Sequence, residues 1–155
     1  MKRLGLLFLL VVSGILVRGQ LMYRNYDLNA ELPVDPAVRK GKLNNGITYY
    51  IRKNSKPEKR AQLILAVNAG STQEDDNQQG LAHFCEHMAF NGTKTWKGND
   101  MIKYFEKAGI HFGEEINAYT SFDETVYMIE LLSDNKDVFN NGFQVLEDWA
   151  GGLLF

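Results

Sequence analysis

The sequence predicts an α+β domain in which helices cover one face of an antiparallel sheet of at least four strands. Two kinds of hydrophobic period point to this fold. Apolar residues alternate along 47–51, 60–69 and 124–133, which is typical of strands. They recur at helical spacing along 101–108 and 134–150. A length of 155 residues, 45% of them hydrophobic, suffices for one domain with a modest core.

The N-terminal segment, 1–19, is predicted to be a signal peptide. Lys2-Arg3 precedes an almost wholly apolar stretch at 4–17, shorter than the ~20 residues that a membrane-spanning helix needs. The chain is therefore expected to be exported, with an uncleaved membrane anchor as the alternative. Residues 20–40 are interrupted by prolines and polar residues and are expected to form a linker.

The strands are expected to begin with a hairpin at 42–53, because Asn45-Gly46 is the strongest two-residue turn signal. A second strand is expected over 60–69. The segments 110–120 and 124–133 are expected to pair with each other around a polar turn. The last of these strands is apolar on both faces, which predicts a central position in the sheet.

Two helices are expected to cover the sheet, beginning near Asn99 and Asp134. Their apolar faces are expected to consist of Met101, Ile102, Phe105 and Ala108 in the first helix, and of Val138, Phe139, Phe143, Leu146 and Trp149 in the second. Both faces are interpreted as core.

A shorter helix is predicted within 80–92, and it carries the chemistry. His83 and His87 lie one turn apart on one face, so both imidazoles can bind one Zn²⁺ at about 2.0–2.1 Å. Glu86 points toward the same face, where it can take a proton from a zinc-bound water with a pKa near ~7. This His-x-x-Glu-His pattern is the inverted form of a common zinc peptidase motif. Mn²⁺ or Co²⁺ could substitute for zinc, and two core histidines beside a solvated glutamate are the alternative.

Other polar residues near the motif receive weaker interpretations. Cys85 lies between the histidines but is expected to point away from their face and pack as a small hydrophobe. The run Glu74-Asp75-Asp76 could support the helix dipole, although a solvated loop is the favoured interpretation. His111 is expected at the surface. The net charge of -2 and the lack of a basic block argue against a nucleic-acid partner.

The region around the motif resembles the pitrilysin/insulinase family of zinc peptidases. The resemblance rests on Ala69-Gly70-Ser71, on the run 80–93 and on a second motif at 117–127, and it extends from about Leu43 to the C-terminus. It is closest to the bacterial, exported members. It implies a periplasmic location, a catalytic zinc ion and, as substrates, peptides or unfolded segments.

The resemblance also assigns roles beyond the motif. It implies that the strand bearing Asn117 and Ala118 is an edge to which a peptide adds beside the zinc; from the residues alone, Asn117 is better explained as a structural hydrogen-bonder. The family's third zinc ligand is a glutamate on a later helix, and a second half closes over the peptide. The segment 41–155 is therefore expected to be the incomplete N-terminal part of a catalytic domain, with the third ligand beyond Phe155. Alone it is expected to bind zinc weakly and hydrolyse little.

Three other interpretations stay open. The chain could belong to a non-catalytic family member that acts as a binding or scaffold subunit, with a homologous partner supplying a second half. It could be related to S-ribosylhomocysteine lyases, which carry a similar motif. Those enzymes use a downstream cysteine as a ligand, however, and Cys85 is the one cysteine in this sequence. An unproductive gene fragment is the third possibility.

Overall fold

A computed structural model of the chain describes residues 27, 29–30 and 33–155. The chain divides into two compact units, Met1–Lys53 and Asn54–Phe155. The predicted signal peptide and most of the predicted linker before residue 33 lie outside the described residues. Among the helices of the described ranges, none combines the length and the apolar character that crossing a lipid bilayer requires.

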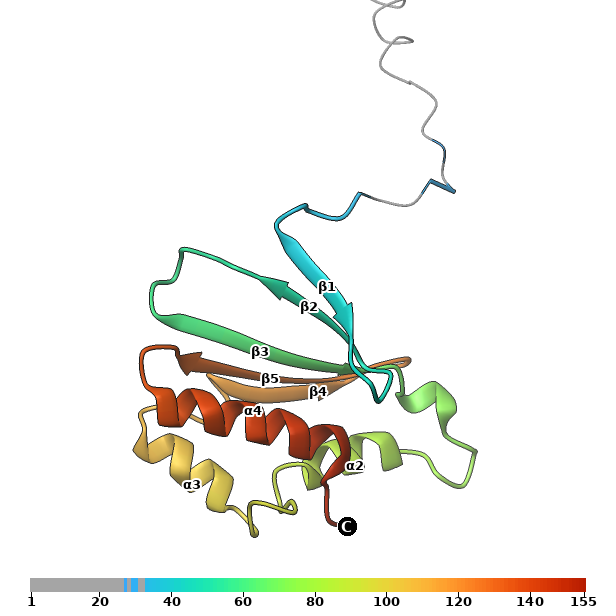
Figure 1. The fold of residues 1–155 in the computed structure, drawn as a ribbon. Helices are drawn as coiled ribbons and strands as arrows, with labels where there is room; N and C mark the ends of the chain where they lie inside the picture. Colours follow the sequence, from blue (N-terminus) through green and yellow to red (C-terminus); the bar gives the residue numbers. More distant parts are fainter. Residues whose placement is uncertain (1–26, 28, 31–32) are drawn as a thin grey trace, which may run out of the picture. The chain divides into compact units, whose positions relative to one another are not determined.

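The described elements follow one another in mixed α and β order (Figure 1). In chain order they are β1 (Val38–Lys42), β2 (Thr48–Arg52), β3 (Arg60–Val67), the short 3-10 helix η1 (Ser71–Gln73), α2 (Leu81–Met88), α3 (Asp100–Lys107), β4 (Ile116–Thr120), β5 (Thr125–Leu132) and α4 (Lys136–Gly151).

The first unit contains the predicted hairpin. Strands β1 and β2 pair antiparallel, and the chain reverses at Asn45-Gly46, where the Leu43 N–H donates to the Ile47 carbonyl at 2.8 Å. The turn prediction is therefore confirmed, while β1 begins at Val38, inside the segment expected to be linker. The hairpin forms a sheet of its own. The expectation of one sheet with at least four strands is thus wrong for the described residues, because their hydrogen-bond ladders make a two-stranded and a three-stranded sheet.

The second unit is built on the three-stranded antiparallel sheet, in the order β3-β5-β4. Strand β5 is central, as its two apolar faces predict: Ile129 pairs with Leu63 on one side and with Ile116 on the other. Helices α2, α3 and α4 all lie on one side of this sheet (Figure 1). The predicted α+β architecture with helices on one face is confirmed.

The core of this unit lies between the sheet and the helices. Its largest fully buried apolar side chains are Met101, Phe105, Ile110, Ile116, Ile129, Leu131 and Val145. Helix α4 packs closely on the sheet at Gly142, where a Cβ would lie 2.1 Å from Cδ1 of Leu131. The predicted apolar face of α3 is confirmed, whereas Phe143 of α4 is 49% exposed and Val145 takes its place in the core.

One predicted strand begins too early. The segment 110–120 was expected to be extended throughout, but β4 begins only at Ile116. Before it the chain makes a tight loop in which the His111 carbonyl accepts from the N–H groups of Glu115 and Ile116. Gly113 adopts a φ of 89°, which favours glycine. Ile110 packs in the core from this loop. In the sequence, an apolar residue at this position looks like the start of a strand.

Candidate metal centre

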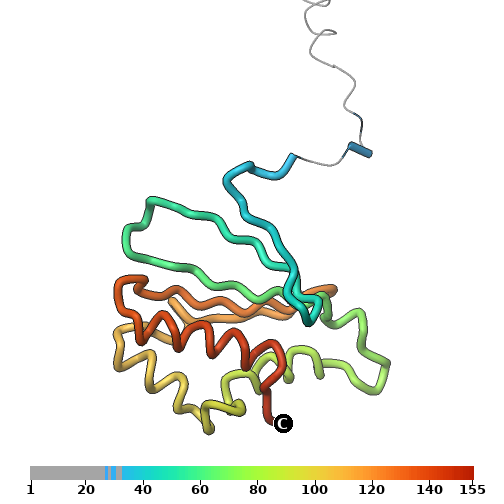
Figure 2. The backbone as a smooth tube through the Cα atoms, viewed as in Figure 1, coloured from blue at the N-terminus to red at the C-terminus, as the bar shows by residue number. Residues whose placement is uncertain are grey.

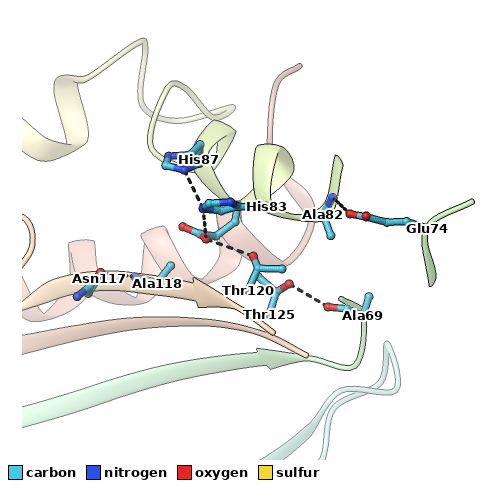
Figure 3. Close-up of polar contacts among 10 residues, drawn as sticks. Ala69, Glu74, Ala82, His83, His87, Asn117, Ala118, Thr120 and Thr125 are labelled. Carbon is cyan, nitrogen blue, oxygen red and sulfur yellow. Dashed lines mark hydrogen bonds and ion pairs between the residues drawn. The ribbon is translucent and has the colours of Figure 1, made fainter. Parts of the chain in front are cut away.

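The motif lies on α2, which is the helix predicted from the sequence. Its first turn is held from outside by Glu74, whose two carboxylate oxygens accept from the N–H groups of Gly80 at 2.8 Å and Ala82 at 2.7 Å. Figure 3 shows the bond to Ala82. These are donors that a helix start leaves without intrahelical partners. The favoured interpretation of the acidic run as a solvated loop is therefore wrong for Glu74, which supports the helix dipole; Asp75 and Asp76 are exposed.

The far end of α2 is fixed by α4. The indole N–H of Trp149 donates to the carbonyl of Ala89, the residue that follows the last turn, at 3.1 Å. Both groups are buried. The tube in Figure 2 shows the C-terminal end of α4 arriving beside this part of the chain, and the Lys94 N–H donates to the Gly152 carbonyl there. The helix that carries the motif is thus held at both ends by residues outside it, Glu74 shortly before it and Trp149 far along the chain.

His83 and His87 converge as predicted. Their Nε2 atoms lie 3.0 Å apart, their ring centroids 4.6 Å apart, and both side chains are exposed (Figure 3). Two imidazole nitrogens that share a tetrahedral zinc at about 2.0–2.1 Å would lie roughly 3.3–3.4 Å apart. The observed spacing is within a few tenths of an ångström of that value. The pair therefore fits one zinc ion, with an opening to solvent on the exposed side.

Glu86 lies beneath the histidines at the interface between α2 and β4. It is 7% exposed, and its Oε2 lies 3.8 Å from Nε2 of His83. The same oxygen accepts from the hydroxyl of Thr120 at 3.2 Å. The carboxylate is buried, so the exposed histidines are the more accessible metal ligands. It is nevertheless near enough to exchange a proton with a molecule bound at the histidines.

A third ligand does not come from the part of the chain that the structure describes, where no group of three or more His, Cys, Asp or Glu side chains could hold a metal ion. His111 is exposed and outside the site. Asp148 is buried and accepts from the hydroxyls of Thr93 and Thr95, while Glu147 is exposed on α4. The described residues therefore offer two nitrogen ligands and one carboxylate beside them.

Tyr127 lies behind the motif, in the core of the second unit. The pKa of Tyr127 is raised to about 12, mainly by burial and to a smaller extent by the neighbouring Glu86 and Cys85. Cys85 is a half-buried free thiol. Its partial burial agrees with the expectation that it packs as a small hydrophobe.

Strand β4 forms one edge of its sheet beside α2. The Glu115 carbonyl accepts from the Glu130 N–H on β5, so the alternation of an antiparallel ladder turns the backbone groups of Ala118 toward the outer edge. There the Ala118 N–H donates to Oδ1 of Asn117 at 2.9 Å. Asn117 therefore has the structural hydrogen bond expected from its residue type, and it makes that bond at the edge itself.

A cavity of about 300 Å³ opens beside His83. It is lined by Ser71, Glu74, Gly80, His83, Thr120, Ser121 and Phe122. Two of these residues, Glu74 and Thr120, also contact α2. The sequence had suggested support of the helix dipole for the acidic run that contains Glu74, whereas Thr120 was not singled out for a role in the site. Thr120 could have been found, because it lies two positions after Ala118 and so on the same face of the strand.

The comparisons with known proteins agree with this geometry. Residues 49–155 match the family described as Insulinase (Peptidase family M16). The chain is 41% identical over 155 residues to "Probable zinc protease PqqL" of Haemophilus influenzae and 42% identical over 152 residues to the protein of the same name in Escherichia coli. These alignments cover 100% and 97% of this chain but only 16% of each relative.

A solved structure shows the same fold. The crystal structure of the first half of the periplasmic protease PqqL from Escherichia coli superposes with a TM-score of 0.77 at 43% sequence identity. The match covers 81% of this chain and 27% of that chain. The chain thus spans a small part of the proteins it is similar to.

Proposed function

Since the chain belongs to the insulinase family (peptidase family M16), we propose that it is the N-terminal, zinc-binding part of a metalloendopeptidase that acts on peptides or unfolded segments. The observation that carries the proposal is the convergence of the His83 and His87 Nε2 atoms, 3.0 Å apart, with the Glu86 carboxylate 3.8 Å from the first of them.

Each residue of the motif has one role in this proposal. His83 and His87 hold the zinc ion through their Nε2 atoms. When bound, zinc supplies Lewis acidity, which lowers the pKa of water and polarises a carbonyl. Glu86 accepts the proton of the water that attacks the peptide carbonyl and delivers it to the leaving amine nitrogen as the C–N bond breaks.

The peptide is proposed to bind as an added strand along β4. The outward carbonyl of Ala118 supplies a hydrogen bond that does not depend on the substrate's side chains. The small side chain of Ala118 permits close approach, and Asn117 holds the edge in shape through its bond to the Ala118 N–H. A substrate placed there lies beside α2, which carries the histidines.

The remaining parts of the active protein are proposed to lie outside this chain. The third zinc ligand would be a glutamate on a later helix, and a second peptidase half would close over the peptide. Residues 1–19 would direct export, with the periplasm as the location. The Escherichia coli protease with 43% identity is a periplasmic protein, which supports this proposal.

The test is Glu86→Gln in the full-length protein encoded by the gene. We expect this variant to retain one zinc ion and lose peptide hydrolysis by about 10²–10⁴-fold, the usual contribution of a general base. Glu106→Gln, the same change at an exposed position of α3, is the matched control and should leave turnover unchanged. Undiminished turnover by Glu86→Gln would end the assignment of the base.

A further inference from the structure

Thr120 makes a contact that the proposed roles do not use. It is the last residue of β4, and its Oγ1 lies 3.2 Å from Oε2 of Glu86, a residue 34 positions earlier in the chain (Figure 3). Two positions before it on the same strand face is Ala118, whose backbone groups form the outer edge. Thr120 therefore lies between the proposed peptide-binding edge and the proposed base.

The surroundings of Glu86 leave few other groups to orient it. Its side chain is 9% exposed, so water has little access to the carboxylate. Among the described residues, His83 and Thr120 are those whose polar side-chain atoms contact Oε2, at 3.8 Å and 3.2 Å. The imidazole of His83 is 65% exposed, and its Nε2 lies 3.0 Å from Nε2 of His87. The hydroxyl of Thr120 is therefore the hydrogen-bond donor that comes from the sheet side.

We propose that Thr120 is a positioning residue for the hydrolytic reaction: its hydroxyl donates to Glu86 and fixes the carboxylate between the histidine pair and the substrate edge. This inference rests on the proposed function. Because β4 is a strand of a packed sheet, it provides a rigid origin for the bond, and small displacements of a reacting group are costly. The bond also satisfies a carboxylate that would otherwise be buried without a donor.

The kinetic test compares Thr120→Val, which removes the hydroxyl at nearly constant shape, with Thr120→Ser, which keeps it. In the full-length protein, we expect Thr120→Val to lower kcat by about tenfold to a hundredfold while KM changes less than about twofold. Zinc content should stay the same, and Thr120→Ser should keep kcat within about threefold of the wild type. Thr48→Val, at an exposed position of β2, is the matched control. If Thr120→Val does not fold, Thr120→Ala takes its place.

A second measurement, by NMR, tests the contact between Thr120 and Glu86 without measuring turnover. In metal-free protein labelled at the glutamate carboxyl carbon, the Glu86 signal, assigned with Glu86→Gln, should shift in Thr120→Val and stay in place in Thr120→Ser. An unmoved Glu86 signal, or a kcat within about twofold of the wild type for Thr120→Val, would overturn the inference. Thr120→Val can fail in this way while Glu86→Gln is still inactive, and then the proposed function survives. Wild-type turnover by Glu86→Gln would instead remove the proposed function and this inference with it.

Discussion

Glu74 gives the clearest prediction about the scaffold of the site. Its carboxylate caps the first turn of α2 through the N–H groups of Gly80 and Ala82, and His83 is the next residue. Replacing Glu74 with alanine removes both acceptors at once. Replacing it with glutamine leaves one acceptor and points an NH₂ group at the other N–H. The two substitutions therefore remove different amounts of the same cap.

The size of the effect follows from these two bonds. A hydrogen bond to a charged group contributes about 1.5–3 kcal/mol to stability, and an acidic group at a helix start adds about 0.3–1 kcal/mol. Glu74 is half-buried, and water can replace part of what is lost. We therefore expect Glu74→Ala to lower the free energy of unfolding by about 2–3 kcal/mol and Glu74→Gln by about 1–2 kcal/mol. If about half of the larger loss opens the first turn of α2, zinc should bind about tenfold more weakly.

Urea denaturation of the chain and competition with a chelating dye measure the two quantities. Asp76→Asn makes the same change of charge at an exposed neighbour and should alter neither of them. The order Glu74→Ala, then Glu74→Gln, then Asp76→Asn is the expected ranking of the losses. If Glu74→Ala and Asp76→Asn have equal stability and equal zinc affinity, the Glu74 carboxylate does not stabilise α2.

Two further predictions concern the core beneath the site. The pKa of Tyr127 is raised to about 12, mainly by burial, while an unfolded tyrosine titrates near ~10. The unfolded state therefore loses its proton first, so the free energy of unfolding should fall as pH rises from about 10 to 12. Denaturation across that range should show a smaller fall for Tyr127→Phe. Leu131→Ala, on the central strand, should cost about 2–5 kcal/mol, whereas Ile64→Ala, at a side chain 52% exposed, should cost less than about 1 kcal/mol.

The elements that could be predicted are those whose signal is local. The alternation of β5, the turn at Asn45-Gly46 and the helical spacing of α3 each lie within a few residues of sequence. Strand β1 was not predicted because its residues are mostly charged and exposed. Its position depends on pairing with β2 rather than on a hydrophobic face. The start of β4 was misplaced because the buried Ile110 packs in the core from a loop. A hydrophobic period cannot distinguish those two reasons for burial.

The contacts of the site also divide into local ones, which the sequence predicts, and long-range ones, which it does not. One helical turn brings His83 and His87 together, so five residues of sequence were enough to predict their convergence. The contacts of Glu86 with Thr120 and of Trp149 with Ala89 join residues far apart in the chain, and they depend on how β4 and α4 pack against α2. Periodicity carries no information about such pairings.

A zinc site has two requirements, namely the geometry of the ligand pair and the number of ligands, and this chain meets them to different extents. The shape is set inside this chain, since Glu74 holds one end of α2 and Trp149 the other. The number is not met by the described residues, which bring two histidines together without a third ligand. A preformed pair loses less entropy on binding a metal than a flexible pair does. An added segment that supplies one carboxylate at the histidine face should therefore raise zinc affinity without reorganising α2.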